Sequence, residues 1–413
     1  MRFTAPVCAA AAAALISACG GAPVASPSPL PSIAARPTAT PAGTTRPTTP
    51  PSAYLGSLDV LPGEPRPGFD RDIRCTGAIG AEDPVALVTV ASASVDEGEQ
   101  VVLLDLADPA SPRTACELGS SDELYDAFLL DNRHLVIHDA EAEPVELFAI
   151  VDLPEVRYRW FALPTGTGWG SELLAIGPSL DRIIWNDVHA GDKDVDEIHL
   201  ATAGADTVIA TVPDTNAGRC GQPNDSSTGR YNRTGSAYVL NQPIDGWQSL
   251  LIIDATVGEQ AVPPAGGWPA GEQPQMAVWR PTNEELYWSQ GGDVLRWTPD
   301  MGTKRTFEGV TWFDPTFSAD GRYLAWIAGG NGGPGDLYVY DTQSAAAPKK
   351  VSGSSMSPRF LDATQLWFRT GEPMGDCTSQ SPTPRVLEVT TGTVLDSEIP
   401  DVLSAWPATS AQD

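Results

Sequence analysis

The chain has 413 residues, 53 of them acidic and 25 basic, and a formal net charge of −28 at pH 7. All the acidic residues follow residue 58, together with 22 of the basic ones, which leaves this part at −31. That charge argues against nucleic acid and against an anionic lipid surface as partners. It also keeps an exported domain soluble, which is the simpler interpretation.

Residues 1–18 have the pattern of an export signal. Arg2 precedes an apolar run from Phe3 to Ile16, which is too short to span a bilayer as a mature helix. The run ends in Ile16-Ser17-Ala18-Cys19, which resembles the lipobox of bacterial lipoproteins. That resemblance implies that Cys19 is lipidated and becomes the first mature residue. An ordinary secretory signal followed by a chance cysteine is the alternative.

Residues 19–53 consist mainly of Pro, Ala, Ser and Thr. Such a segment cannot bury a core, and its prolines favour extended conformations, so we expect a disordered stalk. The folded domain is then expected to span residues 54–413. A lipid anchor and a stalk place this domain outside the cytoplasm, at the cell surface or in the periplasm.

Four cysteines remain after the signal and the anchor: Cys75, Cys116, Cys220 and Cys377. They are far apart and include no C-x-x-C pair, so a zinc or redox site has no support. An even number in an exported chain favours two disulfides. Of the three pairings, we prefer Cys75–Cys116 with Cys220–Cys377.

The domain is expected to be all-β. Short β-branched or aromatic runs bounded by turn residues occur throughout, and no long segment has a helical period. Examples are the runs Val85–Val90, Val101–Leu106, Leu135–His138, Ser249–Asp254 and Asp336–Tyr340.

A turn, a short apolar strand and a tryptophan recur along the chain. Four copies end at Trp185, Trp288, Trp326 and Trp367. The repeats are about 40 to 55 residues apart, a spacing typical of four-stranded propeller blades. We expect a single β-propeller of seven blades, at about 84–118, 121–163, 172–212, 219–262, 274–307, 312–351 and 355–398, with six as the alternative. An open sheet edge invites aggregation, so residues 401–406 or those after Cys75 should close the ring.

The sharpest copy runs from Pro315 to Trp326 and continues from Gly335 to Asp341. Asp320-Gly321 supplies a tight turn, and Leu324 and Trp326 share one face of the next strand. In these residues the chain resembles the TolB-type, WD-repeat-like propeller family. The resemblance implies the fold over most of residues 75–407. It leaves the function open, since one propeller fold serves many functions.

The long connections are expected at one end of the ring. Tight turns join the first and second strands of a blade, whereas long segments precede each blade and join its second and third strands. Loops on a rigid scaffold commonly bind partners. Trp169 and Trp268 lie in two of these loops and are candidate binding residues.

Asp192, Asp194 and Asp196 alternate as in calcium loops, but they lack the glycine and the distant glutamate of an EF-hand. A solvated hairpin tip is the simpler interpretation. No cofactor is therefore predicted, and calcium is the one ion that the pattern would suit.

The sequence contains no G-x-S-x-G, H-E-x-x-H or Walker motif, so we assign no catalytic residue. We expect a monomeric binding or scaffolding module for a protein or glycan of the envelope rather than an enzyme. The alternative is an extracytoplasmic carbohydrate-active hydrolase, because paired carboxylates in the propeller mouth would leave no sequence motif.

Overall fold

A computed structural model of the chain describes residues 73–76, 79–80, 82–91, 99–108, 111–120, 127–139, 146–153, 155–163, 170–177, 182–188, 195–202, 205–213, 229–231, 237–244, 247–254, 259–261, 274–308, 310, 312–329, 334–344, 346–374 and 378–410. These residues all belong to the unit Thr49–Asp413. They form strands and turns and contain no helix, as the sequence predicts.

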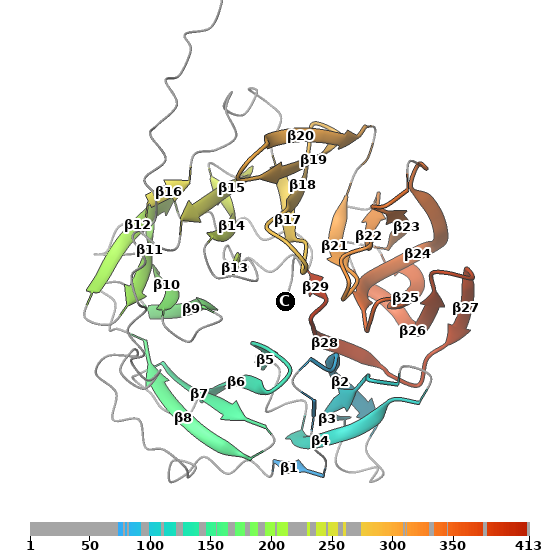
Figure 1. Ribbon diagram of the computed structural model, residues 1–413, viewed down its shortest axis with the longest axis horizontal. Helices are drawn as coiled ribbons and strands as arrows, with labels where there is room; N and C mark the ends of the chain where they lie inside the picture. Colours follow the sequence, from blue (N-terminus) through green and yellow to red (C-terminus); the bar gives the residue numbers. More distant parts are fainter. Residues whose placement is uncertain are drawn as a thin grey trace, which may run out of the picture. The chain divides into compact units, whose positions relative to one another are not determined.

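The strands form six antiparallel sheets (Figure 1). The first contains β1 (Arg74–Cys75), β2 (Val85–Ala91), β3 (Glu99–Asp105), β4 (Arg113–Ser120) and β28 (Asp401–Trp406). The second contains β5 (Phe128–Leu129), β6 (His134–Asp139), β7 (Leu147–Asp152) and β8 (Arg157–Ala162). The third contains β9 (Gly170–Ile176), β10 (Arg182–Val188), β11 (Val195–Thr202) and β12 (Ala205–Pro213).

The fourth sheet contains β13 (Gly229–Tyr231), β14 (Ala237–Ile244), β15 (Trp247–Asp254) and β16 (Glu259–Ala261). The fifth contains β17 (Pro274–Trp279), β18 (Leu286–Gln290), β19 (Asp293–Thr298) and β20 (Gly302–Phe307). The sixth contains β21 (Phe313–Phe317), β22 (Tyr323–Ala328), β23 (Gly335–Asp341), β24 (Lys349–Phe360), β25 (Gln365–Met374), β26 (Thr378–Glu388), β27 (Thr393–Asp396) and β29 (Thr409–Ser410).

The sixth sheet spans the last two units that the sequence separated. β24 is 12 residues long. Its first part pairs with β23, and its second part pairs with β25. A continuous strand therefore joins the two units. The expected break at about residues 352–354 is wrong. The second and third strands of the last unit, β25 and β26, are also longer than the expected long connection between them would allow, and Met374 pairs with Thr378.

Each sheet packs against the next, and the order closes on itself. Shared apolar clusters join the first sheet to the second, the second to the third, the fourth to the fifth, the fifth to the sixth and the sixth to the first. β9 and β12 of the third sheet contact β13 and β14 of the fourth. This closed succession of antiparallel sheets is the propeller arrangement (Figure 1).

The repeated tryptophans are the centres of this packing. Trp185, Trp288, Trp326 and Trp367 are among the largest fully buried side chains. Burying an aromatic side chain completely stabilises a fold by roughly 1.5–3 kcal/mol. Leu324 and Trp326 contact the fifth sheet, whereas Ala325 belongs to the cluster on the other side. The predicted alternation along this strand is therefore confirmed.

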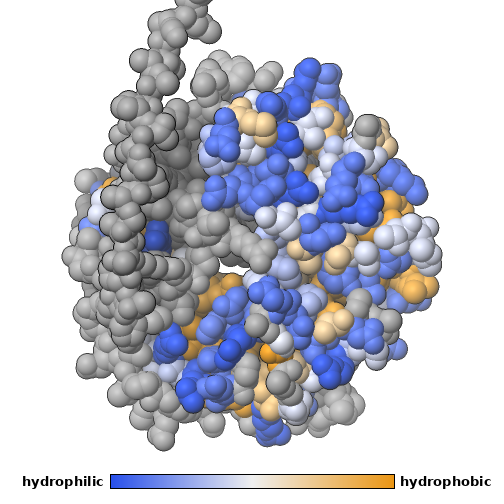
Figure 2. Space-filling model, in the orientation of Figure 1, coloured by the Kyte–Doolittle hydropathy of each residue, from blue (hydrophilic) through white to orange (hydrophobic). Residues whose placement is uncertain are grey.

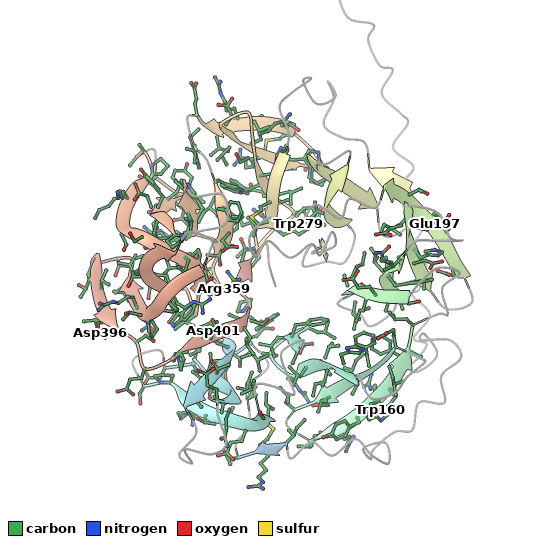
Figure 3. All side chains as sticks on the ribbon, turned by 180° about the vertical axis from the view of Figure 1, so that it is seen from behind. Trp160, Glu197, Trp279, Arg359, Asp396 and Asp401 are labelled. Carbon is green, nitrogen blue, oxygen red and sulfur yellow. A yellow bond between two sulfur atoms is a disulfide. The ribbon has the colours of Figure 1, made fainter. Side chains whose placement is uncertain are left out.

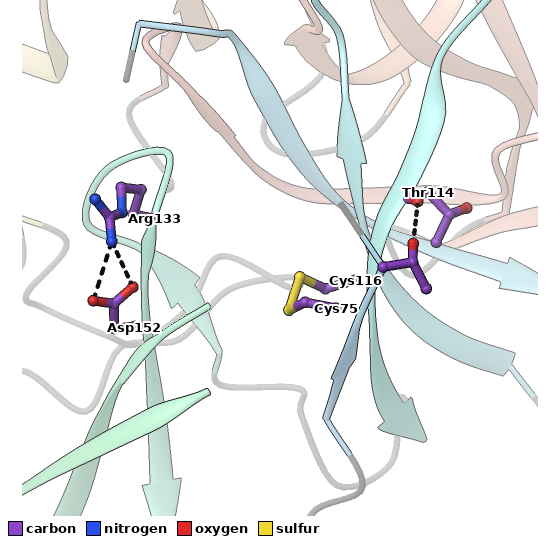
Figure 4. The surroundings of a disulfide bond; sticks show 6 residues. Cys75, Thr114, Cys116, Arg133 and Asp152 are labelled. Atoms are coloured by element: carbon purple, nitrogen blue, oxygen red, sulfur yellow. Dashed lines mark hydrogen bonds and ion pairs between the residues drawn. A yellow bond between two sulfur atoms is a disulfide. The ribbon is translucent and has the colours of Figure 1, made fainter. Parts of the chain in front are cut away.

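Both ends of the described chain contribute to the first sheet. β28 pairs with β2 as its innermost strand, and β1 pairs with β4 as its outermost strand. Residues 401–406 were one of the two segments expected to close the ring, and their pairing with β2 confirms that expectation. β1 ends at Cys75 and lies at the opposite edge of the sheet, so it is not the other candidate, the residues after Cys75. A disulfide joins Cys75 on β1 to Cys116 on β4, the first of the two preferred pairings (Figure 4).

The described surface in Figure 2 is mostly hydrophilic, and its apolar residues lie in small scattered groups. The large apolar side chains exposed among the described residues are Val208, Met301, Val394 and Leu395. They belong to outer strands or turns of three different sheets. These residues therefore do not form one apolar docking patch.

Candidate functional site

Most of the predicted site residues lie outside the described part of the chain. These are Cys19, Trp169, Asp192, Asp194, Cys220, Trp268 and Cys377. Cys75, Cys116 and Asp196 are described. The strands on either side of these segments are described as well, and they define the two ends of the ring.

We letter the strands of each blade a to d from the axis outward. Because neighbouring strands are antiparallel, the a–b and c–d turns share one end of the ring, here called the short-turn end. The b–c and d–a connections share the opposite end, here called the long-loop end. The polar side chains at the two ends have different roles.

Polar side chains at the short-turn end hold the turns together. Oδ1 of Asp131 accepts hydrogen bonds from the backbone N–H groups of Arg133 and His134. Asp320 accepts one from Arg322 N–H, and Asp362 accepts two, from Thr364 and Gln365. These are Asx turns at equivalent a–b positions, so the repeated aspartate has a structural role.

Arginine–aspartate pairs reinforce the same end. The guanidinium of Arg133 donates to both carboxylate oxygens of Asp152, at 3.1 and 3.2 Å (Figure 4). Arg322 and Asp341 form the equivalent pair, with a shortest separation of 2.8 Å. Hydrogen bonding from Arg322 lowers the pKa of Asp341 below its usual value. Each pair joins the start of strand b to the end of strand c.

At the long-loop end, the buried polar side chains lie on the strands near their ends. Strand b ends there, while strands a and c begin there. The buried polar residues at this end are Thr89, Asn186, Asp187, Asp196, Ser289, Gln290, Asp314 and Ser355. They come from four of the six sheets. Buried polar side chains from several sheets gather around this end, which makes it the candidate site.

Innermost strands at this end also carry repeated bulges. Met276, Asp314 and Ser357 have positive φ angles of 32°, 50° and 49°. Each lies within a register shift of β17, β21 or β24. Non-glycine residues rarely adopt this conformation, and bulges redirect side chains next to functional sites. Pro315 and Pro358, which follow two of these positions, are the only hint of the bulges in the sequence, because proline inside a strand often marks a bulge.

Two arginines lie beside these bulges. Arg359 follows Ser357 by two residues on β24 and is only 6% exposed. Arg369 on β25 donates to Oγ of Ser357 at 3.2 Å. Its Nη1 lies 3.9 Å from Oδ2 of Asp401, on the strand that closes the ring. Figure 3 labels Arg359 and Asp401, both on strands at the inner side of the ring.

The third sheet has a polar group on each face. On one face His199 stacks on Trp185 at 4.2 Å, and its Nδ1 lies 3.2 Å from a carboxylate oxygen of Asp206. On the other face Nδ2 of Asn186 donates to Oδ2 of Asp196 at 3.2 Å and to Oε2 of Glu172 at 3.5 Å. The Asp196 side chain is therefore buried against Asn186 of the neighbouring strand and does not lie in a solvated hairpin tip.

The described carboxylates with shifted pKa values are not paired for acid–base catalysis. Burial of Asp131 opposes ionisation, but the hydrogen bond and charge of His134 outweigh it and lower the pKa. Burial raises the pKa of Asp362. Both residues, like Asp341, hold turns or strand ends at the short-turn end. The described residues therefore provide no observation that favours a glycosidase.

No group of three or more His, Cys, Asp or Glu side chains in the described residues is arranged to hold a metal ion. Nor do these residues contain a helix of the length and apolarity that crossing a membrane requires.

No protein-family model matches the chain, and no curated protein matches its sequence. Solved structures with a similar strand arrangement include TolB from Acinetobacter baumannii, at 13% identity and a TM-score of 0.38, covering 78% of this chain and 82% of that one. Another is a putative 6-phosphogluconolactonase from Bacteroides fragilis NCTC 9343, at 10% identity and a TM-score of 0.44, covering 80% and 99%. A third is the β-propeller domain of the Trilobed protease from Pyrococcus furiosus, at 14% identity and a TM-score of 0.40, covering 65% and 83%. These likenesses say nothing of the activity or partners of this chain.

Proposed function

We propose that this chain is a lipid-anchored extracytoplasmic propeller that binds a protein or glycan of the envelope through its long-loop end. The observation that carries the proposal is the difference between the two ends. Polar groups at the short-turn end hold turns and join strand ends, whereas the long-loop end has buried polar side chains from four sheets and, in the fifth and sixth sheets, strained bulges with Arg359 and Arg369 beside them. A rigid ring that presents charged groups and loops at one end suits a binding module.

The export signal, the Cys19 lipobox and the Pro-rich segment support the location. Tethering confines the propeller to one layer, which raises its effective concentration for a partner fixed in the same layer. A modest interface then suffices for binding. The disulfide between Cys75 and Cys116 is consistent with an oxidising compartment outside the cytoplasm. A second bridge, Cys220–Cys377, remains part of the proposal.

A seven-blade ring is the count that this proposal adopts. The second half of β24 with β25, β26 and β27 makes a four-stranded unit, as does its first half with β21, β22 and β23. When these two halves of the sixth sheet are counted as separate blades, the six sheets give seven blades. β28 is the innermost strand of the first blade.

The test is to crosslink the full-length chain to its neighbours in intact cells, purify it, and measure the amount of each captured partner. At the long-loop end the double variant Arg369→Gln, Asp401→Asn removes one charge of each sign. The control is Arg157→Gln, which is exposed at a c–d turn of the short-turn end. We expect capture of a specific partner to fall at least about tenfold in the double variant and to be unchanged in the control, since central charged contacts contribute most to affinity.

Two further single variants, Trp169→Ala and Trp268→Ala, test the loop aromatics in the same assay. Loss of capture in the control with retention in the double variant would place the partner at the short-turn end and refute the proposal. Mass spectrometry of the crosslinked material and a glycan array distinguish a protein partner from a glycan. Turnover of a glycan that a single carboxylate substitution abolishes would replace the binding function with the hydrolase.

A further inference from the structure

Three neighbouring strands of the third sheet each place one oxygen-bearing side chain on the same face. Asn186 on β10 lies opposite Glu172 on β9 and opposite Ile198 on β11. Asp196 precedes Ile198 by two residues and therefore shares its face. All three positions are at the long-loop end, where β10 ends and β11 begins. The three side chains thus converge from three rigid elements.

Asn186 is the unusual member of this group. It is only 1% exposed, and its amide points at the two carboxylates. Its Oδ1, which is buried with it, has no hydrogen-bond partner. Leaving a buried amide oxygen without a partner costs about 1–3 kcal/mol. A rotation of the amide by half a turn would exchange Nδ2 with Oδ1 and bring this oxygen to the carboxylates. The amide nitrogen would then lose its two acceptors, so the rotation is favoured only when a bound cation takes the oxygen.

The distances around the amide fit a cation. Two oxygens that each lie about 2.4 Å from one calcium ion, at roughly a right angle, are about 3.4 Å apart. The separations from the amide nitrogen are 3.2 Å to Asp196 and 3.5 Å to Glu172. After the rotation these would become oxygen–oxygen separations of the same size. Oxygen ligands without nitrogen or sulfur select a hard cation such as Ca²⁺.

We propose that Glu172, Asn186 and Asp196 bind a calcium ion at the long-loop end of the third sheet. Asn186 contributes Oδ1 after the half turn of its amide, and the carboxylates contribute Oε2 and Oδ2. Two carboxylates, one amide and rigid strands give a site for Ca²⁺ rather than for Mg²⁺, which demands a tighter octahedral shell and dehydrates reluctantly. The site does not depend on the proposed partner, and its test needs none.

The test is calorimetric titration of the full-length chain in detergent with CaCl₂, after treatment with EDTA and in about 0.15 M salt, which screens the exposed acidic surface. We expect one saturable site for calcium and weaker binding of magnesium. Asp196→Asn should lower the calcium affinity at least about tenfold, the size of effect seen when the support of a metal ligand is removed. Glu197→Gln is the matched control, because it removes the same charge from the next residue, on the opposite face.

Asn186→Asp separates a calcium site from a purely structural amide. A third carboxylate should lower the melting temperature in EDTA, and calcium should then raise it by more than in the unchanged chain. If the amide serves only to donate hydrogen bonds, the variant loses stability and calcium does not restore it. That result would overturn the proposal, as would unsaturable binding or an equal loss of affinity in Glu197→Gln.

Discussion

Gly321 shows how one residue connects neighbouring sheets. Its φ of 67° places it in the left-handed region, as expected of the Asp320-Gly321 turn. A Cβ there would lie 2.8 Å from Oγ1 of Thr282 and 2.9 Å from the side chain of Arg280, both in the turn that follows β17. Nε of Arg280 donates to the carbonyl oxygen of Gly321 at 2.8 Å. The glycine is therefore required by its conformation and by a close contact between sheets.

We expect Gly321→Ala to lower the free energy of unfolding by more than about 2 kcal/mol, the middle of the range for a non-glycine residue in this conformation. Gly392→Ala is the control. Its φ of 74° imposes the same backbone cost, but its Cβ would meet only Nζ of Lys349, at 3.7 Å. Urea unfolding of both variants measures the difference. Equal losses would mean that the contact with Arg280 and Thr282 adds nothing.

Asp341 and Asp362 should influence the pH dependence of stability in opposite directions. Arg322 lowers the pKa of Asp341 in the folded state, so its contribution is present above the unfolded pKa of about 3.9 and is lost as the pH falls through the folded value. Burial raises the pKa of Asp362, so its contribution is present below the unfolded pKa and is lost as the pH rises through the folded value.

The corresponding experiment compares Asp341→Asn with Asp362→Asn by urea unfolding between pH 3 and 7. Asp341→Asn should be less stable than the unchanged chain at pH 7 and should lose less on acidification. Asp362→Asn keeps an oxygen that can accept from Thr364 and Gln365, so it should remain near the original stability at pH 7. Parallel pH profiles for the two variants would contradict this account.

Among the elements, β28 both pairs with an edge strand and buries apolar side chains between two sheets. It covers the inner edge of β2, and its Val402 and Ala405 are buried in the cluster that joins the sixth sheet to the first. Without it β2 would expose an unpaired edge, and these apolar contacts would be lost. β29 makes a smaller contribution, because it pairs with β21 at only two positions.

A chain that ends at Ile399 should therefore lose cooperative unfolding and aggregate. A chain that ends at Ala408 keeps β28 and the buried Ala408 and loses only β29, so it should fold with a modest loss of stability. Thermal unfolding monitored by circular dichroism, with light scattering as a second signal, distinguishes the two. Cooperative unfolding of the shorter chain would show that β28 does not close the ring.

For the whole molecule, the main prediction concerns the anchor. If Ile16-Ser17-Ala18-Cys19 is a lipobox, Cys19→Ala should abolish lipidation and release the protein from the membrane fraction. Two acyl chains supply stable anchoring, and the variant lacks the cysteine that would carry them. Labelling with a fatty-acid analogue and membrane fractionation provide the measurements. Cys8→Ala, within the apolar run of the signal, is the matched control, and equal fractionation of both variants would refute the anchor.

The sequence by itself determined the all-β class, the strand positions, the turns and the buried tryptophans. Local pattern suffices for these features, because alternation, turn residues and aromatic spacing act within one strand or hairpin. It also gave residues 401–406 as one of two candidates for closing the ring, since an open edge must be covered, and β28 confirms that candidate. It did not predict the continuous β24, because both separate strands and one long strand satisfy the same local pattern.

Only the tertiary structure decided which polar residues meet. Glu172, Asn186 and Asp196 come from three strands, and Arg369 meets Asp401 across two sheets. Their proximity depends on register and on the packing of blades far apart in sequence, and a shift of one residue would turn each side chain to the other face. The same holds for the strained bulges, which only pairing with a neighbouring strand can create. The two ends of the ring therefore differ for reasons that no single segment contains.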